Sequence, residues 1–297
     1  MVTVAVVVCS RDRPAQLAQC LEGVKAQEYD ELLVVDSASG SGATQAVAGD
    51  HGLRCIRVDL PGLARARNAA VRATSADGVA FTDDDCSPAG DWAAAIRARF
   101  TQSMAEAERL GFVAGRVVAE GDGQPVSVRL GAAPQRYAGD DDVSRIGHGA
   151  NLAVSRACWA DLHGFDELLG VGAPLRSAED TDFMWRALRQ GWVGRFEPSA
   201  VVSHTQWRGR ADALRASYGY GIGAGALRHK VALLAGRQAG RHLSDGSLRT
   251  TVKQAAADAR NRYEFGVAIN LARAAGIAVG RARAARLAVV DGRLAPR

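Results

Sequence analysis

The chain has 297 residues, 47% hydrophobic and 23% charged, which is typical of a folded globular protein and excludes a disordered one. This length predicts one large domain or two smaller ones. The five cysteines are scattered and form no Cys-x-x-Cys pair, so a disulfide framework or a zinc site is not indicated and a cytoplasmic location is expected. No run of about 18 uncharged apolar residues occurs, and Met1 leads into apolar residues 2–9 without a basic leader. We therefore expect neither a membrane-spanning helix nor a signal peptide.

The charge is divided unevenly along the chain. The net charge is +5, but residues 205–297 hold 17 Arg or Lys and five Asp or Glu, a local charge of +12. This leaves −7 on residues 1–204. An acidic body followed by a basic tail predicts two parts with different tasks.

Short β-branched runs alternate with helical patterns through the first half. The helical patterns are one around Leu17, Leu21 and Val24, with Pro14 placed for the first turn, and two more over residues 63–74 and 91–110. This alternation predicts βαβ units in a doubly wound, mostly parallel sheet. The strands expected, each nearly continuous in apolar residues, are 3–9, 31–36, 54–59, 79–82 and 112–118.

The second half is less regular. Residues 120–147 are rich in Gly, Asp, Gln and Pro and predict a long loop. Order returns at residues 149–154, and residues 177–190 predict a helix with an acidic start. Two short strands are expected after it, at 195–197 and 201–204, and only helices are expected beyond residue 208.

Three successive carboxylates, Asp83-Asp84-Asp85, follow the fourth predicted strand. Three like charges at this point favour a bound cation, and Asp83 and Asp85 should point the same way in an extended segment. The alternative is an acidic turn before the next helix. A second triplet, residues 140–142, follows no strand and is interpreted as solvated surface. Two other phosphate-binding patterns, Gly-x-Gly-x-x-Gly after the first strand and Gly-x4-Gly-Lys-Ser/Thr, are absent from the sequence.

Together these motifs resemble the inverting glycosyltransferases of family 2, which have the GT-A fold. The resemblance covers residues 2–207 and depends on motifs that stand in the family's order. They are Ser10-Arg11-Asp12-Arg13, Asp36 with Ser39, Gly62 to Asn68, Asp83-Asp84-Asp85, residues 149–154, the Gly164-Phe165-Asp166-Glu167 and Ala178 to Phe183 blocks, and Val202-Ser203-His204.

The resemblance implies roles for individual residues. Catalysis is implied for Asp180, with Glu179 beside it. Binding of Mn²⁺ or Mg²⁺ is implied for Asp83, Asp85 and His204. Contact with the donor sugar or the acceptor is implied for Gly149, Asn151 and Trp207. Donor-nucleotide binding is implied for Ser10, Asp12, Arg13, Asp36, Ser39, Arg67, Asn68, Asp83 and Asp84.

These roles fit the chemistry of inverting sugar transfer. The leaving nucleoside diphosphate gains negative charge that a metal ion offsets, and the attacking hydroxyl must lose its proton to a base, for which we choose Asp180. Each assignment has a structural alternative. Glu179 and Asp180 could complement a helix dipole, and His204 could be an ordinary strand residue. Arg67 could pair with the acidic triplet, and Asp36 could cap the next helix.

We therefore predict a GT-A catalytic domain over residues 1–207 and a basic helical region over residues 208–297. The basic region could bind the acceptor, cover the diphosphate, or contact anionic lipid at the inner face of the cell membrane. Nucleic acid is not expected as a partner, because the net positive charge is confined to this region. The expected partners are a nucleoside-diphosphate sugar and an unidentified acceptor: a glycan, lipid carrier, peptide or small natural product. Alternative functions are a sugar nucleotidyltransferase, for which residues 9–14 lack the glycine-rich turn, and a non-catalytic nucleotide-binding protein.

Overall fold

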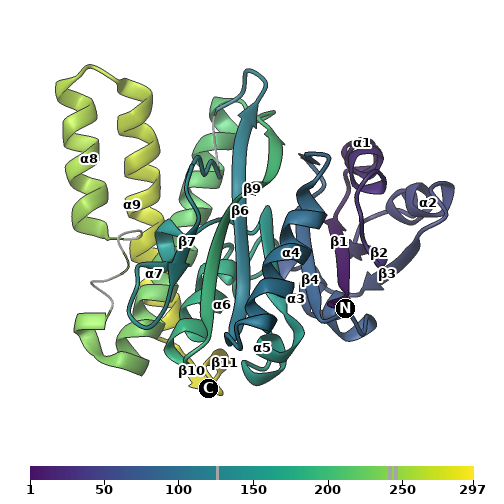
Figure 1. The fold of residues 1–297 in the computed structure, drawn as a ribbon. Coiled ribbons are helices and arrows are strands. Elements are labelled where there is room, and N and C mark those ends of the chain that lie inside the picture. Colours follow the sequence, from purple (N-terminus) through teal and green to yellow (C-terminus); the bar gives the residue numbers. More distant parts are fainter. Residues whose placement is uncertain (125–126, 240–242, 244–246) are drawn as a thin grey trace.

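The computed structural model describes residues 1–124, 127–239, 243 and 247–297. Its centre is a nine-stranded sheet in the order β3-β2-β1-β4-β8-β6-β9-β5, with β7 also paired to β9 (Figure 1). The strands are β1 (Val4–Ser10), β2 (Glu31–Ser37), β3 (Arg54–Val58), β4 (Gly78–Asp83), β5 (Cys86–Pro88), β6 (Leu110–Glu120), β7 (Gln135–Tyr137), β8 (Asn151–Ser155) and β9 (Val193–Thr205).

Most of the longer strands pair in parallel, whereas the short strands β5, β7 and β8 are antiparallel to their neighbours. β2, β1 and β4 pair in parallel, as do β6 and β9. β8 lies between β4 and β6 and is antiparallel to both, while β5 and β7 are antiparallel to β9. The predicted α/β sheet of mostly parallel strands is confirmed.

Helices cover both faces of the sheet. Because side chains alternate along a strand, Val4, Val6 and Val8 of β1 face one core and Val7 faces the other. The first core is closed by α1 (Pro14–Lys25), α2 (Ala43–Asp50) and α4 (Trp92–Ala105). The second core is closed by α3 (Leu63–Ala73), α5 (Arg156–Asp161) and α6 (Glu179–Arg189). Pro14 lies in the first turn of α1, as predicted.

The two short strands expected at 195–197 and 201–204 are one strand, β9. Its partner β6 shifts register between Gly115 and Arg116, opposite the interruption at residues 198–200, so the pairing resumes beyond it. This irregularity explains why the sequence suggested two elements. The loop predicted over 120–147 contains β7 and the short 3₁₀ turn Val143–Arg145, and its residues 125 and 126 lie outside the described part.

Three helices follow the sheet: α7 (Arg210–Ala239), α8 (Leu248–Arg260) and α9 (Glu264–Ala284). In Figure 1, α8 and α9 stand on the side of the sheet opposite β1 to β3. α7 is interrupted at Gly236, whose φ is 81°. α7 and α9 approach closely, because a Cβ on Gly221 would lie 2.2 Å from the Arg273 carbonyl oxygen and one on Gly225 would lie 2.2 Å from the Ile277 carbonyl oxygen.

The prediction that only helices follow residue 208 is wrong. The chain closes with a hairpin of β10 (Leu287–Val290) and β11 (Arg293–Pro296), which turns at residues 291 and 292, both with positive φ. The hairpin residue Leu294 packs with Leu169 and Ile222. None of the helices in the described part of the chain combines the length and the hydropathy that a bilayer span requires.

Candidate active site

A cavity of about 750 Å³ lies where the carboxyl ends of β1, β2 and β4 meet. Its inner wall comes from these strand ends and from the start of α6, and its outer wall comes from α7, α8 and α9. Nine predicted site residues line it: Ser10, Arg13, Arg67, Asp83, Asp85, Gly149, Glu179, Asp180 and His204. Trp207 is not part of the wall formed by the described residues, but its neighbour Arg208 is.

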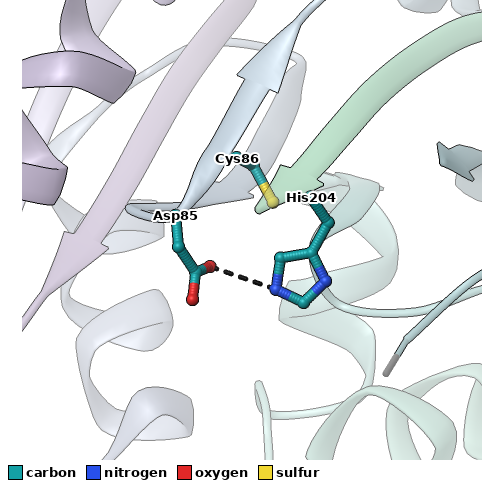
Figure 2. Close-up of side chains that lie close together, drawn as sticks. All are labelled: Asp85, Cys86 and His204. Carbon is teal, nitrogen blue, oxygen red and sulfur yellow. Dashed lines mark ion pairs between the residues drawn. The ribbon is translucent and has the colours of Figure 1, made fainter. Parts of the chain in front are cut away.

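Asp85 and His204 form the floor of the cavity on the β4–β5 side. Asp85 Oδ1 lies 3.3 Å from His204 Nε2, because β5 pairs with the end of β9 and places Cys86 opposite His204. Figure 2 shows the carboxylate and the imidazole pointing toward one another, with the Cys86 thiol beside them. Single ligand atoms of the three residues lie within 4.8 Å of one another. The sequence analysis did not single out Cys86.

The other Asp85 oxygen is held by two donors. Oδ2 accepts hydrogen bonds from Arg13 Nη1 at 2.9 Å and from Trp207 Nε1 at 2.8 Å. Burial alone would raise the pKa of Asp85, but the hydrogen bond from His204 and the charge of Arg13 outweigh it and hold this pKa well below its usual value. Asp85 therefore stays ionised and ready to accept a cation.

The three carboxylates of the triplet do not face the same way. Asp83 and Asp85 line the cavity, as alternation in an extended segment predicts. Asp84 lies outside the cavity wall that the described residues form, is fully buried and pairs with Arg13. Burial raises the pKa of Asp84 to about 7, although the charge of Arg13 opposes this. Residues 140 and 141 of the second triplet are exposed, as interpreted from the sequence, whereas Asp142 is half-buried and accepts a hydrogen bond from the Ser144 backbone N–H.

Arg67 connects the elements that surround the cavity. Its guanidinium, only 1% exposed, lies 2.9 Å from Glu179 Oε1 and 3.6 Å from Asp83 Oδ1, and donates to the Gly149 carbonyl at 2.9 Å. The rings of Phe81 and Phe165 lie within 6 Å of it. A Cβ on Gly149 would approach Arg67 Nη2 to 2.5 Å, so any other residue here would have to displace the Arg67 guanidinium from its partners. Arg67 therefore fixes β4, β8 and α6 relative to one another.

Asp180 and Glu179 open α6 but have different surroundings. Asp180 accepts hydrogen bonds from the backbone N–H groups of Gly149 and Thr181, both at 2.7 Å, and is half-buried. Glu179 is buried against Arg67. Burial and, next, the negative charge of Asp180 raise the pKa of Glu179 to about 7. Ala178, just before them, has a left-handed φ of 72°, which is uncommon for a residue with a side chain.

The predicted donor residues on β2 form a turn beside Asp12. Asp36 accepts from the Ser39 backbone N–H at 2.8 Å and pairs with Arg57, and the Ser39 hydroxyl accepts from the Asp12 backbone N–H at 3.0 Å. Asp12, Asp36 and Ser39 are not part of the wall formed by described residues. The sequence analysis missed Arg57, which lies on β3 and whose pairing with β2 brings it opposite Asp36.

Two predicted asparagines hold the scaffold together. The Asn68 amide donates to the Phe165 carbonyl and accepts from Trp159 Nε1. Asn151, which is buried, accepts from Trp92 Nε1 and donates to the carbonyls of Arg116 and Ala200. Neither is part of the described cavity wall, so their predicted contacts with the donor stay predictions. Trp207 is half-exposed and reaches the site through its bond to Asp85.

A buried ionic network lies next to the site and was not predicted. Lys230 of α7 is fully buried, 2.8 Å from Asp166 Oδ2 and 2.6 Å from Asp182 Oδ1. Arg186 pairs with Asp182 at 2.8 Å, and the backbone N–H of Leu294 donates to Asp166. The network joins α6, α7 and β11. The only hint in the sequence was that Lys230 is one of three lysines among 37 basic residues.

The sequence and the fold are similar to those of known glycosyltransferases. Residues 5–138 match the family model described as glycosyl transferase family 2. The pre-mycofactocin glycosyltransferases of two Mycobacterium tuberculosis strains, CDC 1551 / Oshkosh and ATCC 25618 / H37Rv, are each 31% identical over 179 residues. That match covers 57% of this chain and 36% of theirs, so the chain spans about a third of the length of these curated relatives.

Two solved structures share the fold over nearly the whole chain. The mannosyltransferase PcManGT from Pyrobaculum calidifontis, in complex with GDP-Man and Mn²⁺, has a TM-score of 0.60 at 21% identity, covering 93% of this chain and 86% of that one. Residues 1–349 of S. aureus TarS have a TM-score of 0.59 at 15% identity, covering 99% and 96%. The complex of TarS with UDP-GlcNAc has a TM-score of 0.54.

The sheet order, the acidic end of β4 and these likenesses define a protein of the GT-A fold. Within that class, residues 5–138 match the model of glycosyl transferase family 2. The resemblance stated from the sequence motifs is thereby confirmed.

Proposed function

We propose that the chain is a metal-dependent inverting glycosyltransferase that moves a sugar from a nucleoside diphosphate to an acceptor hydroxyl. The observation that carries this proposal is that one cavity is lined by the Asp85–His204 pair and by the Asp180 carboxylate. The Asp85–His204 pair is suited to binding a metal ion, and the Asp180 carboxylate is suited to accepting a proton. Two structural neighbours were solved as complexes, one with GDP-Man and Mn²⁺ and the other with UDP-GlcNAc. These complexes support a nucleoside-diphosphate sugar as the donor.

The residues present fit a hard divalent cation. Neighbouring ligands of an octahedral ion such as Mg²⁺ lie about 3 Å apart, and the Asp85 and His204 ligand atoms are 3.3 Å apart. Carboxylate oxygen and imidazole nitrogen suit Mn²⁺ as well. Asp85, His204 and Asp83 would hold the ion, which when bound supplies positive charge to the leaving diphosphate.

The donor would be held mainly by cavity residues. Arg13 and Arg67 place positive charge on the wall, and Ser10 adds a hydroxyl at the end of β1. The turn formed by Asp12, Asp36 and Ser39 would contact the nucleoside part of the donor, next to the cavity wall. Asp84 and Asn68 would act by keeping Arg13 and α3 in position, because the first is buried against Arg13 and the second bonds to the Phe165 carbonyl.

Asp180 is the proposed general base. Oδ1 accepts from the backbone N–H and the hydroxyl of Thr181, whereas Oδ2 accepts only the Gly149 N–H among the described residues and keeps a lone pair for the acceptor hydroxyl. As the acceptor oxygen bonds to the anomeric carbon, its proton passes to Asp180 and the bond to the diphosphate oxygen breaks with its electron pair on the leaving group. Attack from the face opposite the leaving group inverts the anomeric centre. Glu179 is held by Arg67 on the same cavity wall and is the proposed neighbour that orients the acceptor.

Two variants separate the chemistry from binding. Asp180→Asn keeps the shape but cannot take the proton, so turnover should fall by about 10²–10⁴ while donor affinity changes little. Asp85→Ala should abolish metal-dependent binding of UDP and GDP by calorimetry, and Asp141→Ala, on the exposed triplet, is the matched control. Melting temperatures of all variants verify folding.

The product distinguishes the alternatives. A transferase releases a nucleoside diphosphate, whereas a sugar nucleotidyltransferase releases pyrophosphate and a non-catalytic protein releases neither. Near-normal turnover of Asp180→Asn would remove Asp180 from the base role, and equal losses for Asp85→Ala and Asp141→Ala would remove the metal assignment.

A further inference from the structure

The outer part of the cavity contains a polar cluster that lies outside the proposed donor and metal sites. Asp258 of α8, only 8% exposed, accepts hydrogen bonds from Gln254 Nε2 at 2.9 Å and from Asn270 Nδ2 at 2.8 Å. All three side chains line the cavity. We call them the Asp258 cluster. Two amides and one carboxylate gathered on two helices give a set of fixed donors and acceptors on this wall.

Aromatic rings lie beside the Asp258 cluster. Tyr263 and Phe265 both line the cavity, and Tyr263 is 52% exposed. Gly266 makes room for this arrangement, because a Cβ there would lie 2.2 Å from the Tyr263 ring and 2.7 Å from Asp258 Oδ2. Arg210 lies over the Phe265 ring, with its guanidinium carbon 5.2 Å from the centroid. An exposed ring next to a carboxylate offers an apolar face and a hydrogen-bonding edge together.

Tyr220 connects this outer part to the inner part. It lies on α7, lines the same cavity and bonds to Ser127 through its hydroxyl. Both Asp83 and Asp85 act on it electrostatically. A molecule seated on the Asp258 cluster therefore lies in the same continuous space as the donor.

The charged residues on the cavity wall limit the kinds of ligand that could bind at the Asp258 cluster. Each Asp258 oxygen uses one lone pair for an amide and keeps others, which suits hydroxyl donors. An anion would meet the Asp258 carboxylate, and a cation would meet Arg208 and Arg273, which also line the cavity. A neutral ligand with several hydroxyls and an apolar face avoids both conflicts.

We propose that the Asp258 cluster, with Tyr263, is the acceptor subsite and that it binds a neutral sugar or similar polyol. This inference depends on the proposed function, since it assigns the acceptor of the same cavity. The carboxylate and amides would bind hydroxyls of the acceptor, and the Tyr263 ring would pack against its C–H face.

Binding of simple glycosides tests the proposal without turnover. The probes are the methyl glycosides of glucose, galactose, mannose and N-acetylglucosamine, added to the full chain with Mn²⁺ and UDP or GDP and followed by saturation-transfer NMR. We expect at least one glycoside to bind, with affinity reduced about tenfold in Asp258→Asn and in Tyr263→Ala, because each variant removes a direct contact. Asp212→Asn and Leu271→Ala are the controls, since both residues are exposed and lie outside the described cavity wall. Both controls should bind as the parent does.

The outcomes separate the two proposals. Absence of binding by all four glycosides, or unchanged binding in both Asp258→Asn and Tyr263→Ala, overturns the subsite. Asp258-dependent binding of butylammonium or inorganic phosphate instead of the glycosides also overturns it, because the ligand would then be charged. Failure of the chain to bind UDP or GDP with Mn²⁺ and to release nucleoside diphosphate contradicts the proposed function. Glycoside binding without nucleotide remains measurable in that case.

Discussion

Replacing Lys230 by methionine tests whether the buried ionic network holds the helices to the sheet. Lys230, Asp166 and Asp182 are all at most 1% exposed at their side chains, and Arg186 completes a set of two positive and two negative groups. At an effective dielectric constant of about 20, each ion pair of Lys230 has a Coulomb energy of about 6 kcal/mol, which desolvation largely offsets. Lys230→Met leaves one negative charge without compensation.

We therefore expect Lys230→Met to lower the free energy of unfolding by about 3–5 kcal/mol. Urea unfolding followed by circular dichroism measures this loss. The control is Arg215→Ala, which removes the exposed Arg215–Asp212 pair and should cost less than about 1 kcal/mol. Adding Asp166→Asn to Lys230→Met restores neutrality and should recover part of the loss. A loss below about 1 kcal/mol for Lys230→Met, or no recovery in the double variant, would refute the reasoning.

Three further predictions concern the site and the basic region. Gly149→Ala forces a Cβ against Arg67 and should destabilise the chain by about 1–3 kcal/mol, whereas Gly49→Ala, with open space around it, should not; equal melting temperatures would contradict this. The pKa of Glu179 is raised from 4.5 to about 7, so its carboxyl lowers stability as pH rises through this window. Relative to Glu179→Gln, the parent should lose about 3 kcal/mol of unfolding free energy between pH 5 and pH 8, and parallel pH curves would show that Glu179 titrates normally. The charge of +12 on residues 205–297 and the exposed Leu248 and Val252 predict sedimentation with anionic vesicles at low but not high salt; equal sedimentation with neutral vesicles would exclude an electrostatic contact.

The sheet was predictable where local sequence and topology agree. The apolar runs of β1, β2 and β4 are strands because they are buried on both faces, and the parallel order then brings Ser10, Asp83 and Arg67 to one edge. The acidic start of α6 was likewise readable, since Glu179 and Asp180 stand in its first turn. These features could be predicted because they depend on residues close in the sequence or on the rule that sites form at the carboxyl ends of parallel strands.

Other features depend on contacts between distant segments. β9 continues past residues 198–200 only because β6 shifts register beside it, which no local pattern reveals. The strand at 287–290 follows the Ala- and Arg-rich end of α9 and, among the residues that the structure describes, pairs only with residues 293–296. Lys230 and Asp166 are 64 positions apart, and Asp258 meets Asn270 only through the turn between α8 and α9. The division at residue 207 stays a prediction.

The shared carboxylate of Asp166 limits how this chain can be recombined with its relatives. One oxygen, Oδ2, receives both the Lys230 ammonium from α7 and the Leu294 backbone N–H from β11. A chimaera that joined residues 1–207 to the helices of another protein would therefore bury Asp166 without a cation and leave Asp182 with Arg186 alone, unless the graft supplied a cation at the place of Lys230. Exchange of the helical region by segment swapping consequently requires the α6, α7 and β11 positions to be transferred together, whereas point changes on α8 and α9 leave this junction intact.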